Sequence, residues 1–320
     1  MTRIRHFFGA AGLAALAASA AADGCDRTPL PPATAQAPHR VLFVGNSFLH
    51  GHKPPVLHHN ATRVTDLNGS GFGGVPGLVK QLADDAGVAL EVSSELVSGQ
   101  TLAFHLGEKR ALIASRPWDV VVLQEYSTLS PQQPGDAAAF VAAVRELDAL
   151  VHGVNPAARV YLLETWARAD QVYRTPGGRW MAGSLEAMQG DLHAAYAHAM
   201  AQSPCVVGVL PVGDAALRAV QDGVADRNPF DGIDPGRVNL WGDDSYHFGP
   251  WGSYLEALVI LGGLSGRDPA GLDVDGRAGR ALGLPAGDID AAKAVASRQW
   301  RAPHAGAVSP PAAPASPTRP

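Results

Sequence analysis

The chain has 320 residues, of which 46% are hydrophobic and 17% are charged, and its formal net charge is −5. This length and hydrophobic content suffice for one domain with a full core, and the length alone would also permit two. No block of clustered Lys and Arg occurs in the sequence. Because phosphate binding depends on such clusters, the composition argues against nucleic acid as a partner.

The first 24 residues predict a secretory signal peptide that is not part of the fold. Two arginines near the start precede an apolar run over residues 7–18, which is too short to span a membrane, and residues 18–22 contain two A-x-A cleavage patterns. We therefore expect export to the periplasm or outside the cell, with no transmembrane segment. The Ala-Asp-Gly before Cys25 is a poor match to a lipobox, so lipid anchoring at Cys25 is the disfavoured alternative.

The sequence contains two cysteines, Cys25 and Cys205. In an exported chain they could form one disulfide. Cys205 begins an apolar run, however, and this favours the alternative that it is a buried hydrophobic residue. No C-x-x-C or other pattern of metal-binding cysteines occurs in the sequence.

Composition divides the chain after the signal peptide into four parts. Residues 25–38, rich in Pro, Thr and Ala, are expected to be a linker. Residues 39–265 are expected to form the main domain. Residues 266–300 form an extension with a short helix over residues 288–298, and the Pro- and Ala-rich residues 301–320 are expected to be disordered.

Short apolar runs and segments with helical spacing alternate along the main domain. The expected strands are residues 41–44, 88–97, 118–123, 159–164 and 206–210. The expected helices are residues 75–86, 101–115, 134–153, 184–202, 211–222 and 253–264. This alternation predicts an α/β three-layer sandwich with a central, mostly parallel five-stranded sheet.

The first expected strand ends at a serine. The apolar run over residues 41–44 predicts a strand buried on both faces, and Gly45, Asn46 and Ser47 follow it directly. This position is at the carboxyl edge of an α/β sheet, where such folds place their ligands. Ser47 is therefore a candidate nucleophile. The alternative is that Asn46 and Ser47 serve only as a turn or helix cap.

The next segment, residues 49–74, is a long loop rich in Gly, Asn and His. It contains His50, His52, His58 and His59, which as a group could bind a metal. Their spacing fits no closed ligand set, so we expect no metal there. A substrate-facing or solvated loop is the default, because long loops beside a nucleophile often shape a binding site.

A second polar block lies near the end of the main domain, where Asp244 and His247 precede the expected helix over residues 253–264. An Asp three residues before a His can hold the imidazole, which is then free to take a proton from a serine hydroxyl. Asp243 is the neighbouring carboxylate and could take the place of Asp244.

Together the two blocks resemble those of the SGNH, or GDSL-like, hydrolase superfamily. The G-N-S-F of residues 45–48 is a variant of the G-D-S-L motif, residues 244–247 match the D-x-x-H block, and the resemblance covers residues 39–265. It implies the flavodoxin-like SGNH fold and a carboxylic ester hydrolase that works through an acyl-enzyme, without metal or organic cofactor. The catalytic triad that it implies is Ser47, Asp244 and His247.

The resemblance also implies an oxyanion hole made of the N–H groups of Ser47 and Gly99 and one side-chain amide. The family has an asparagine in its third block, whereas this chain has Gln124 at the end of a strand. We interpret Gln124 as the replacement, with Glu125 either orienting it or capping the next turn. For Gly99, the alternative role is that of a glycine needed by the turn.

Four residues near the expected strand ends are candidates for substrate binding, namely Asn46, Glu125, Glu164 and Trp166. The substrate class expected is a small acyl ester, including an O-acetyl group on a glycan. Aromatic side chains that could stack on sugars are Trp166, Tyr173, Trp180 and Trp241. The alternatives are a non-catalytic ligand- or carbohydrate-binding homologue, because fold does not fix function, and a metal-dependent hydrolase that uses the histidine-rich loop.

Overall fold

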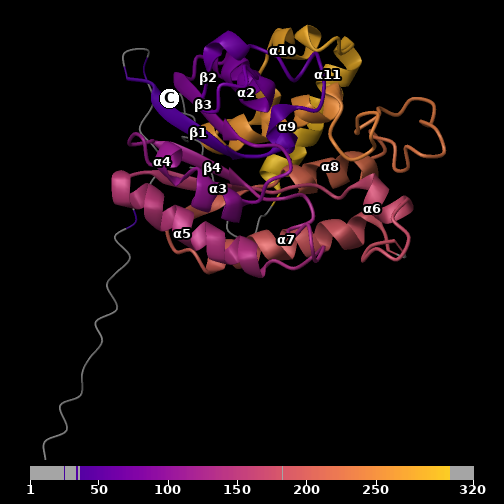
Figure 1. Cartoon of the computed structure of the whole chain (residues 1–320). Coiled ribbons are helices and arrows are strands. Elements are labelled where there is room, and N and C mark those ends of the chain that lie inside the picture. The colour runs from indigo at the N-terminus through magenta and orange to yellow at the C-terminus, as the bar shows by residue number, and fades with distance from the viewer. Residues whose placement is uncertain (1–24, 26–33, 35–36, 182, 303–320) are drawn as a thin grey trace, which may run out of the picture.

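The computed structural model describes residues 25, 34, 37–181 and 183–302. The expected signal peptide, most of the expected linker and nearly all of the expected C-terminal tail lie outside the described residues. The described part forms an α/β fold with one sheet and helices on both of its faces (Figure 1).

The sheet has six strands in the order β2-β3-β1-β4-β5-β6, and every neighbouring pair is parallel. The strands are β1 (His39–Gly45), β2 (Val64–Asp66), β3 (Leu90–Leu96), β4 (Val120–Gln124), β5 (Arg159–Leu163) and β6 (Val206–Leu210). The five expected strands are present, but the count of five is wrong. β2 was missed because three residues are too few to give a periodic pattern.

Helices connect the strands and follow the last one. They are α1 (Ser47–His50), α2 (Gly74–Asp85), α3 (Leu102–Glu108), α4 (Arg110–Ile113), α5 (Ala138–Val154), α6 (Ala169–Tyr173), α7 (Leu185–Ala201), α8 (Val212–Gln221), α9 (Pro250–Ser265), α10 (Arg277–Ala281) and α11 (Ala286–Arg301). Two short 3-10 turns, η1 (Ala61–Arg63) and η2 (Pro269–Gly271), complete the set. The helix expected over residues 101–115 is two helices that meet at Lys109, whose φ of −118° is not helical.

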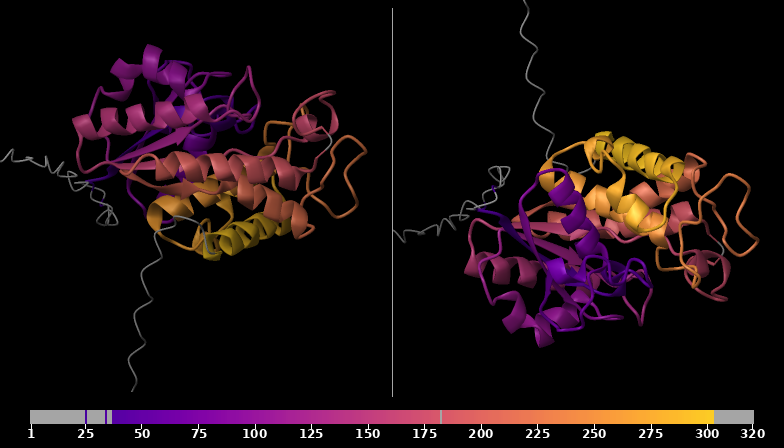
Figure 2. Two further views of the ribbon diagram at one scale, coloured as in Figure 1. Left: turned by 90° about the horizontal axis from the view of Figure 1, so that it is seen from below. Right: turned by 90° about the horizontal axis from the view of Figure 1, so that it is seen from above.

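The helices form two layers around the sheet (Figure 2). α3, α5 and α7 pack side by side in one layer, and α2, α8, α9 and α11 pack together in the other. Between them, Val41, Leu42, Phe43 and Val44 of β1 are fully buried. A strand covered on both faces needs apolar residues at every position, which explains the unbroken apolar run in the sequence.

The segment after α9 packs onto the main domain. The Trp251 Nε1 donates to the carbonyl of Asp288 at 2.9 Å, and the Arg218 Nε donates to Gln299 Oε1 at 2.7 Å. The short helix expected over residues 288–298 lies within the longer α11. α11 therefore forms part of the outer helical layer.

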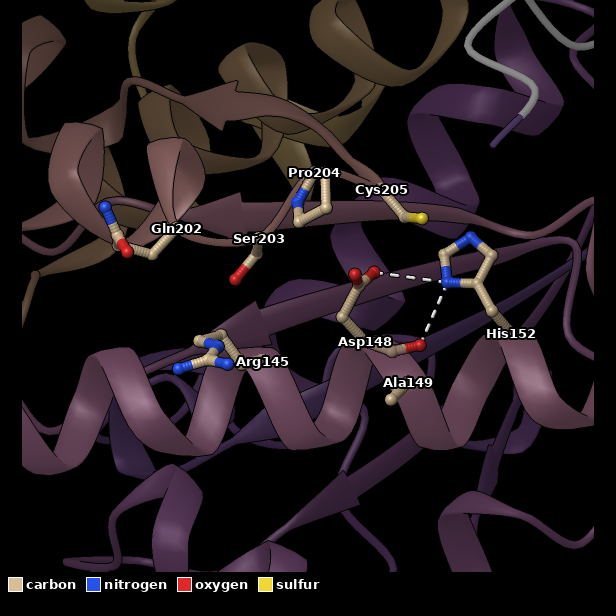
Figure 3. A pocket seen from close by; sticks show the side chains of 8 residues that line it. All are labelled: Arg145, Asp148, Ala149, His152, Gln202, Ser203, Pro204 and Cys205. Atoms are coloured by element: carbon tan, nitrogen blue, oxygen red, sulfur yellow. Dashed lines mark hydrogen bonds and ion pairs between the residues drawn. The ribbon is translucent and has the colours of Figure 1, made fainter. Parts of the chain in front are cut away.

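A disulfide joins Cys25 to Cys205, with the two Cα atoms 5.3 Å apart. The expectation that Cys205 is a free buried hydrophobe is therefore wrong. Beside it, at the amino-terminal edge of the sheet, lies a cavity of about 220 Å³ lined partly by Asp148 and His152 of α5 (Figure 3). None of the helices in the described part of the chain combines the length and the hydropathy that a membrane span requires.

Candidate active site

The first part of the site is the turn between β1 and α1. Asn46 is extended, and its Oδ1 accepts a hydrogen bond from the Phe48 N–H at 3.2 Å, so it caps α1, of which Ser47 is the first residue. The Asn46 Nδ2 donates to the carbonyl of Gln100 at 2.9 Å. Asn46 thus fixes Ser47 locally and also ties this turn to the loop that contains Gly99.

The second part is the loop before α9, which brings a carboxylate and an imidazole to Ser47. His247 Nε2 lies 2.8 Å from Ser47 Oγ, and His247 Nδ1 lies 2.6 Å from Asp244 Oδ2. The other oxygen of Asp244 accepts from the N–H groups of Tyr246 and His247 at 3.1 and 3.0 Å. Three residues expected from two distant motifs therefore lie in one line of hydrogen bonds.

Burial and hydrogen bonding set the charge states of this pair. Burial lowers the pKa of His247 and outweighs the opposing effect of Asp244. Burial acts to raise the pKa of Asp244, but the hydrogen bonds from His247 and the backbone outweigh it and lower that pKa. At neutral pH the imidazole is thus neutral. With Nδ1–H donating to the carboxylate, Nε2 is left to accept a proton from Ser47.

The histidine-rich loop contributes one residue to this line. The ring of His52 stacks on that of His247, with centroids 4.7 Å apart and planes 7° apart. The His52 Nε2 lies 3.3 Å from Asp244 Oδ2 and 3.1 Å from Asp243 Oδ1. Asp243 also pairs with Lys53, so its carboxylate faces the loop, whereas that of Asp244 faces His247.

The other three histidines of the loop point to separate partners. His50 is buried, its Nδ1 lies 3.0 Å from Ser98 Oγ, and burial lowers its pKa to about 4. His59 Nε2 lies 2.6 Å from Gln81 Oε1, and His58 packs against an aromatic ring. In the described residues these side chains do not converge with His52 on one ligand position. No sequence signal distinguished His52 from its neighbours, because its role comes from a contact with residue 247.

The three expected oxyanion donors differ in whether they already donate a hydrogen bond within the protein. Gly99 has a φ of 73° and open space on its side-chain side, and neither its N–H nor that of Ser47 donates to an acceptor in the described part of the chain. Gln124 is buried. Its Oε1 accepts from the Asn46 N–H at 2.9 Å, and its Nε2 donates to the carbonyl of Glu125. The Gln124 amide therefore supports the turn before Ser47.

Glu125 caps a helix in the structure. Its carboxylate accepts hydrogen bonds from the N–H groups of Leu102, at the start of α3, and of Tyr126, at 3.3 and 2.5 Å. Burial raises the pKa of Glu125 to about 8. Of the two roles expected for Glu125, the contacts favour the cap, since the side chain makes no bond to the Gln124 side chain.

Trp166 lies beneath the triad. Its ring stacks on Phe48 and on Phe248, with centroid separations of 4.0 and 3.5 Å, and its Nε1 donates to the carbonyl of Tyr246 at 2.9 Å. It is 1% exposed, so it packs between the turn that holds Ser47 and the loop that holds His247. Other tryptophans proposed as stacking faces are also buried, namely Trp180 and Trp241.

Glu164 does not face Ser47. It follows β5, is fully buried, and its Oε2 accepts from the Asp214 N–H of α8 at 3.0 Å. Its Oε1 lies 3.2 Å from Nδ1 of His193 in α7. Glu164 therefore belongs to a different cluster from the triad.

Comparison with solved structures places the fold. A candidate GDSL-like lipase from Parabacteroides merdae matches with a TM-score of 0.52 at 16% identity, covering 75% of this chain and 99% of that chain. A candidate SGNH hydrolase from Slackia heliotrinireducens matches at 22% identity with a TM-score of 0.45, covering 70% and 97%. The acetylxylan esterase Axe2 from Geobacillus stearothermophilus matches at 13% with a TM-score of 0.47, covering 72% and 95%.

No protein-family model and no curated protein matches the sequence. The structural likeness is at low identity and therefore concerns the fold alone. The chain has the α/β fold of SGNH, or GDSL-like, hydrolases, and the expectation of this fold is confirmed.

Proposed function

We propose that the protein is a serine esterase that hydrolyses small acyl esters. The observation that carries the proposal is the line from Ser47 Oγ through the imidazole of His247 to the carboxylate of Asp244, with distances of 2.8 and 2.6 Å. These are the separations over which a proton can be transferred from a nucleophile to a base.

In the first step Ser47 Oγ attacks the acyl carbon while its proton moves to His247 Nε2. Asp244 holds the imidazole and stabilises the imidazolium that forms. The proton then passes to the leaving alcohol, and an acyl-enzyme remains on Ser47. Water attacks the acyl carbon while its proton moves to His247 Nε2, and the bond to Ser47 Oγ then breaks as His247 returns that proton to it, which releases the acid and restores the free serine.

The tetrahedral intermediate carries an oxyanion that needs donors. We assign these to the N–H groups of Ser47 and Gly99, since neither donates elsewhere within the described residues. Gln124 is assigned a different role from the one expected, because its Oε1 accepts from the N–H of Asn46. It would hold the nucleophile turn in place, as Asn46 does from the other side.

For the substrate we propose a short acyl group, with acetate esters of glycans as one class to screen. The buried Trp166, Trp180 and Trp241 offer no free ring face, which weakens the argument for a sugar. We further propose that the chain is exported, which the disulfide between Cys25 and Cys205 supports. A cysteine in a disulfide is not available for lipid attachment.

The alternatives are a non-catalytic binding protein on the same fold and a metal-dependent hydrolase. The second draws support from the ligand atoms of His52, Asp244 and His247, which lie within 4.8 Å of one another. A chelator that abolishes activity would favour it. A protein that neither hydrolyses an ester nor reacts with a serine-directed probe would favour the non-catalytic binding protein.

The test is hydrolysis of an aryl acetate by the mature protein beside Ser47→Ala and His247→Ala. We expect losses of roughly 10⁴-fold or more in kcat for both variants, with their folds intact by circular dichroism. Turnover that survives Ser47→Ala would refute the nucleophile. If the parent is inactive, a fluorophosphonate probe decides, since labelling at Ser47 indicates an esterase of narrow range and its absence a binding protein.

A further inference from the structure

A second histidine lies between two carboxylates, near the carboxyl end of β5. Glu164 follows β5, His193 lies on α7, and Asp214 lies in the first turn of α8. The Nδ1 of His193 is 3.0 Å from Asp214 Oδ2 and 3.2 Å from Glu164 Oε1, and the three atoms all lie within 4.8 Å of one another. Three elements separated in the sequence therefore direct three ligand-type atoms to one point.

Each carboxylate has one oxygen held in place and one directed to this point. The Asp214 N–H donates to Glu164 Oε2 at 3.0 Å, and the Gln189 Nε2 donates to Asp214 Oδ1 at 3.4 Å. Hydrogen bonds of this kind orient the carboxylates of metal sites. Here they leave Glu164 Oε1 and Asp214 Oδ2 turned toward His193.

The Oε1 atom of Glu164 is the feature that indicates a bound cation. Glu164 is fully buried, and this oxygen accepts no hydrogen bond within the described residues. The nearest nitrogen, His193 Nδ1, lies 3.2 Å from it and closer, at 3.0 Å, to Asp214 Oδ2. A buried carboxylate oxygen without a donor is costly, and a bound cation would remove that cost.

We propose that Glu164 Oε1, His193 Nδ1 and Asp214 Oδ2 bind a divalent transition-metal ion, with zinc as the reference ion. Metal–ligand bonds of 2.0–2.2 Å in a tetrahedral site place the ligand atoms about 3.3–3.6 Å apart. The two separations from His193 Nδ1, 3.0 and 3.2 Å, are slightly shorter than this, so a bound ion would move the ligands apart by a few tenths of an ångström. The side chain of His193 is 43% exposed, so water can complete the coordination from the solvent side.

A proton competes with the metal for this site. The imidazole of His193 lies between the carboxylates of Glu164 and Asp214, and when protonated it pairs with both. The charged groups that face His193 are those two carboxylates, and Gln189 on its own helix is neutral. Metal binding must release the imidazole proton, so the affinity rises with pH.

The ion would stabilise the segment that carries Trp166. The Gln189 Oε1 accepts from the Ala167 N–H at 2.9 Å, and its Nε2 lies 3.5 Å from the Thr165 carbonyl. The same glutamine orients Asp214. A metal at this site would therefore fix the end of β5 and, through it, the position of Trp166. It would not take part in ester hydrolysis. The proposal does not depend on the proposed activity.

The test is calorimetric titration of the chelator-treated mature protein with zinc chloride at pH 8, in two buffers of different ionisation enthalpy. We expect a site that releases about one proton on binding. His193→Gln and Asp214→Asn should each weaken it more than about 10-fold, while His198→Ala, an exposed histidine on the same helix, should leave it unchanged.

Zinc could also bind the triad, so the titration is repeated with His52→Ala. A zinc site that is lost in His52→Ala and kept in His193→Gln would overturn the proposal. So would a parent protein that binds no zinc, since the cluster would then be an ion pair alone. If either cluster variant melts far below the parent, Glu164→Gln, which keeps the side-chain shape, replaces it.

Discussion

Two histidines near the carboxyl edge of the sheet are paired with carboxylates, yet their electrostatics are opposite. His247 has one carboxylate at Nδ1 and a serine hydroxyl at Nε2, and burial lowers its pKa. His193 has two carboxylates near one nitrogen, and Glu164 raises its pKa to about 9. The first is suited to accept a proton from Ser47. The second carries a positive charge when protonated. When it is neutral, it can bind the proposed metal ion.

The difference comes from burial and from the number of negative groups. His247 is 5% exposed and has one partner carboxylate, that of Asp244, which also lies 3.3 Å from His52 Nε2. His193 is half exposed, so its cation loses less hydration, and the carboxylate of Glu164 is fully buried. Similar residue types therefore give a base in one place and a cation in the other.

Among the variants that test this difference between the two histidines, the largest effect is expected for Asp244→Asn. An asparagine cannot stabilise the imidazolium and can favour the wrong tautomer of His247, so kcat for an aryl acetate should fall roughly 10³- to 10⁴-fold with little change in KM. The matched control is Asp243→Asn, whose carboxylate faces His52 and Lys53. Equal losses in both variants would contradict the assignment of Asp244.

A smaller effect is expected for His52→Ala, measured as the pH dependence of kcat/KM. The pKa of His247 is lowered by burial and, to a lesser degree, by the charges of His52 and Arg168, and is raised by Asp244. Removing His52 removes one lowering effect, so the pKa of His247 rises. Because the base must be neutral, the acid limb of the profile should move to higher pH.

His58→Ala is the control for that profile, since His58 is an exposed residue of the same loop. It should leave the acid limb where it is in the parent. A limb that moves to lower pH in His52→Ala would show that the stacked ring does not act on His247 as a positive charge.

The smallest effect is expected for the stability of His193→Gln, measured by urea unfolding with a chelator present. The folded pKa of His193, about 9, lies above its usual value of about 6.5. Protonation of His193 thus contributes stability that is fully present below pH 6.5 and is lost as the pH rises through 9. The variant should be less stable by at most about 1 kcal/mol at pH 6, given the exposed imidazole.

At pH 10 the difference in the free energy of unfolding between parent and His193→Gln should be close to zero. A difference that is constant from pH 6 to 10 would mean that His193 contributes through packing and not through its charge. Together with Asp244→Asn, this measurement tests whether the two histidines differ in charge at neutral pH.

Much of the fold could be predicted because its strands and helices produce recognisable local patterns of apolar residues. Buried parallel strands such as residues 41–44 and 120–123 appear as unbroken apolar runs, and the amphipathic helices have their own spacing. β2 escaped because its three residues carry no period, and its place at the edge depends on pairing with β3. The split between α3 and α4 likewise left no mark in the apolar spacing.

The sequence by itself determined the turn that holds Ser47 and the Asp244–His247 spacing, because each depends on residues two or three positions apart. Only the tertiary structure decided which side chains meet across elements. It places His52 on His247, engages Gln124 beneath Ser47, and turns Glu164 away toward His193. The physical reason is that these contacts join distant segments, and their energies depend on burial and on neighbouring charges that no local pattern encodes.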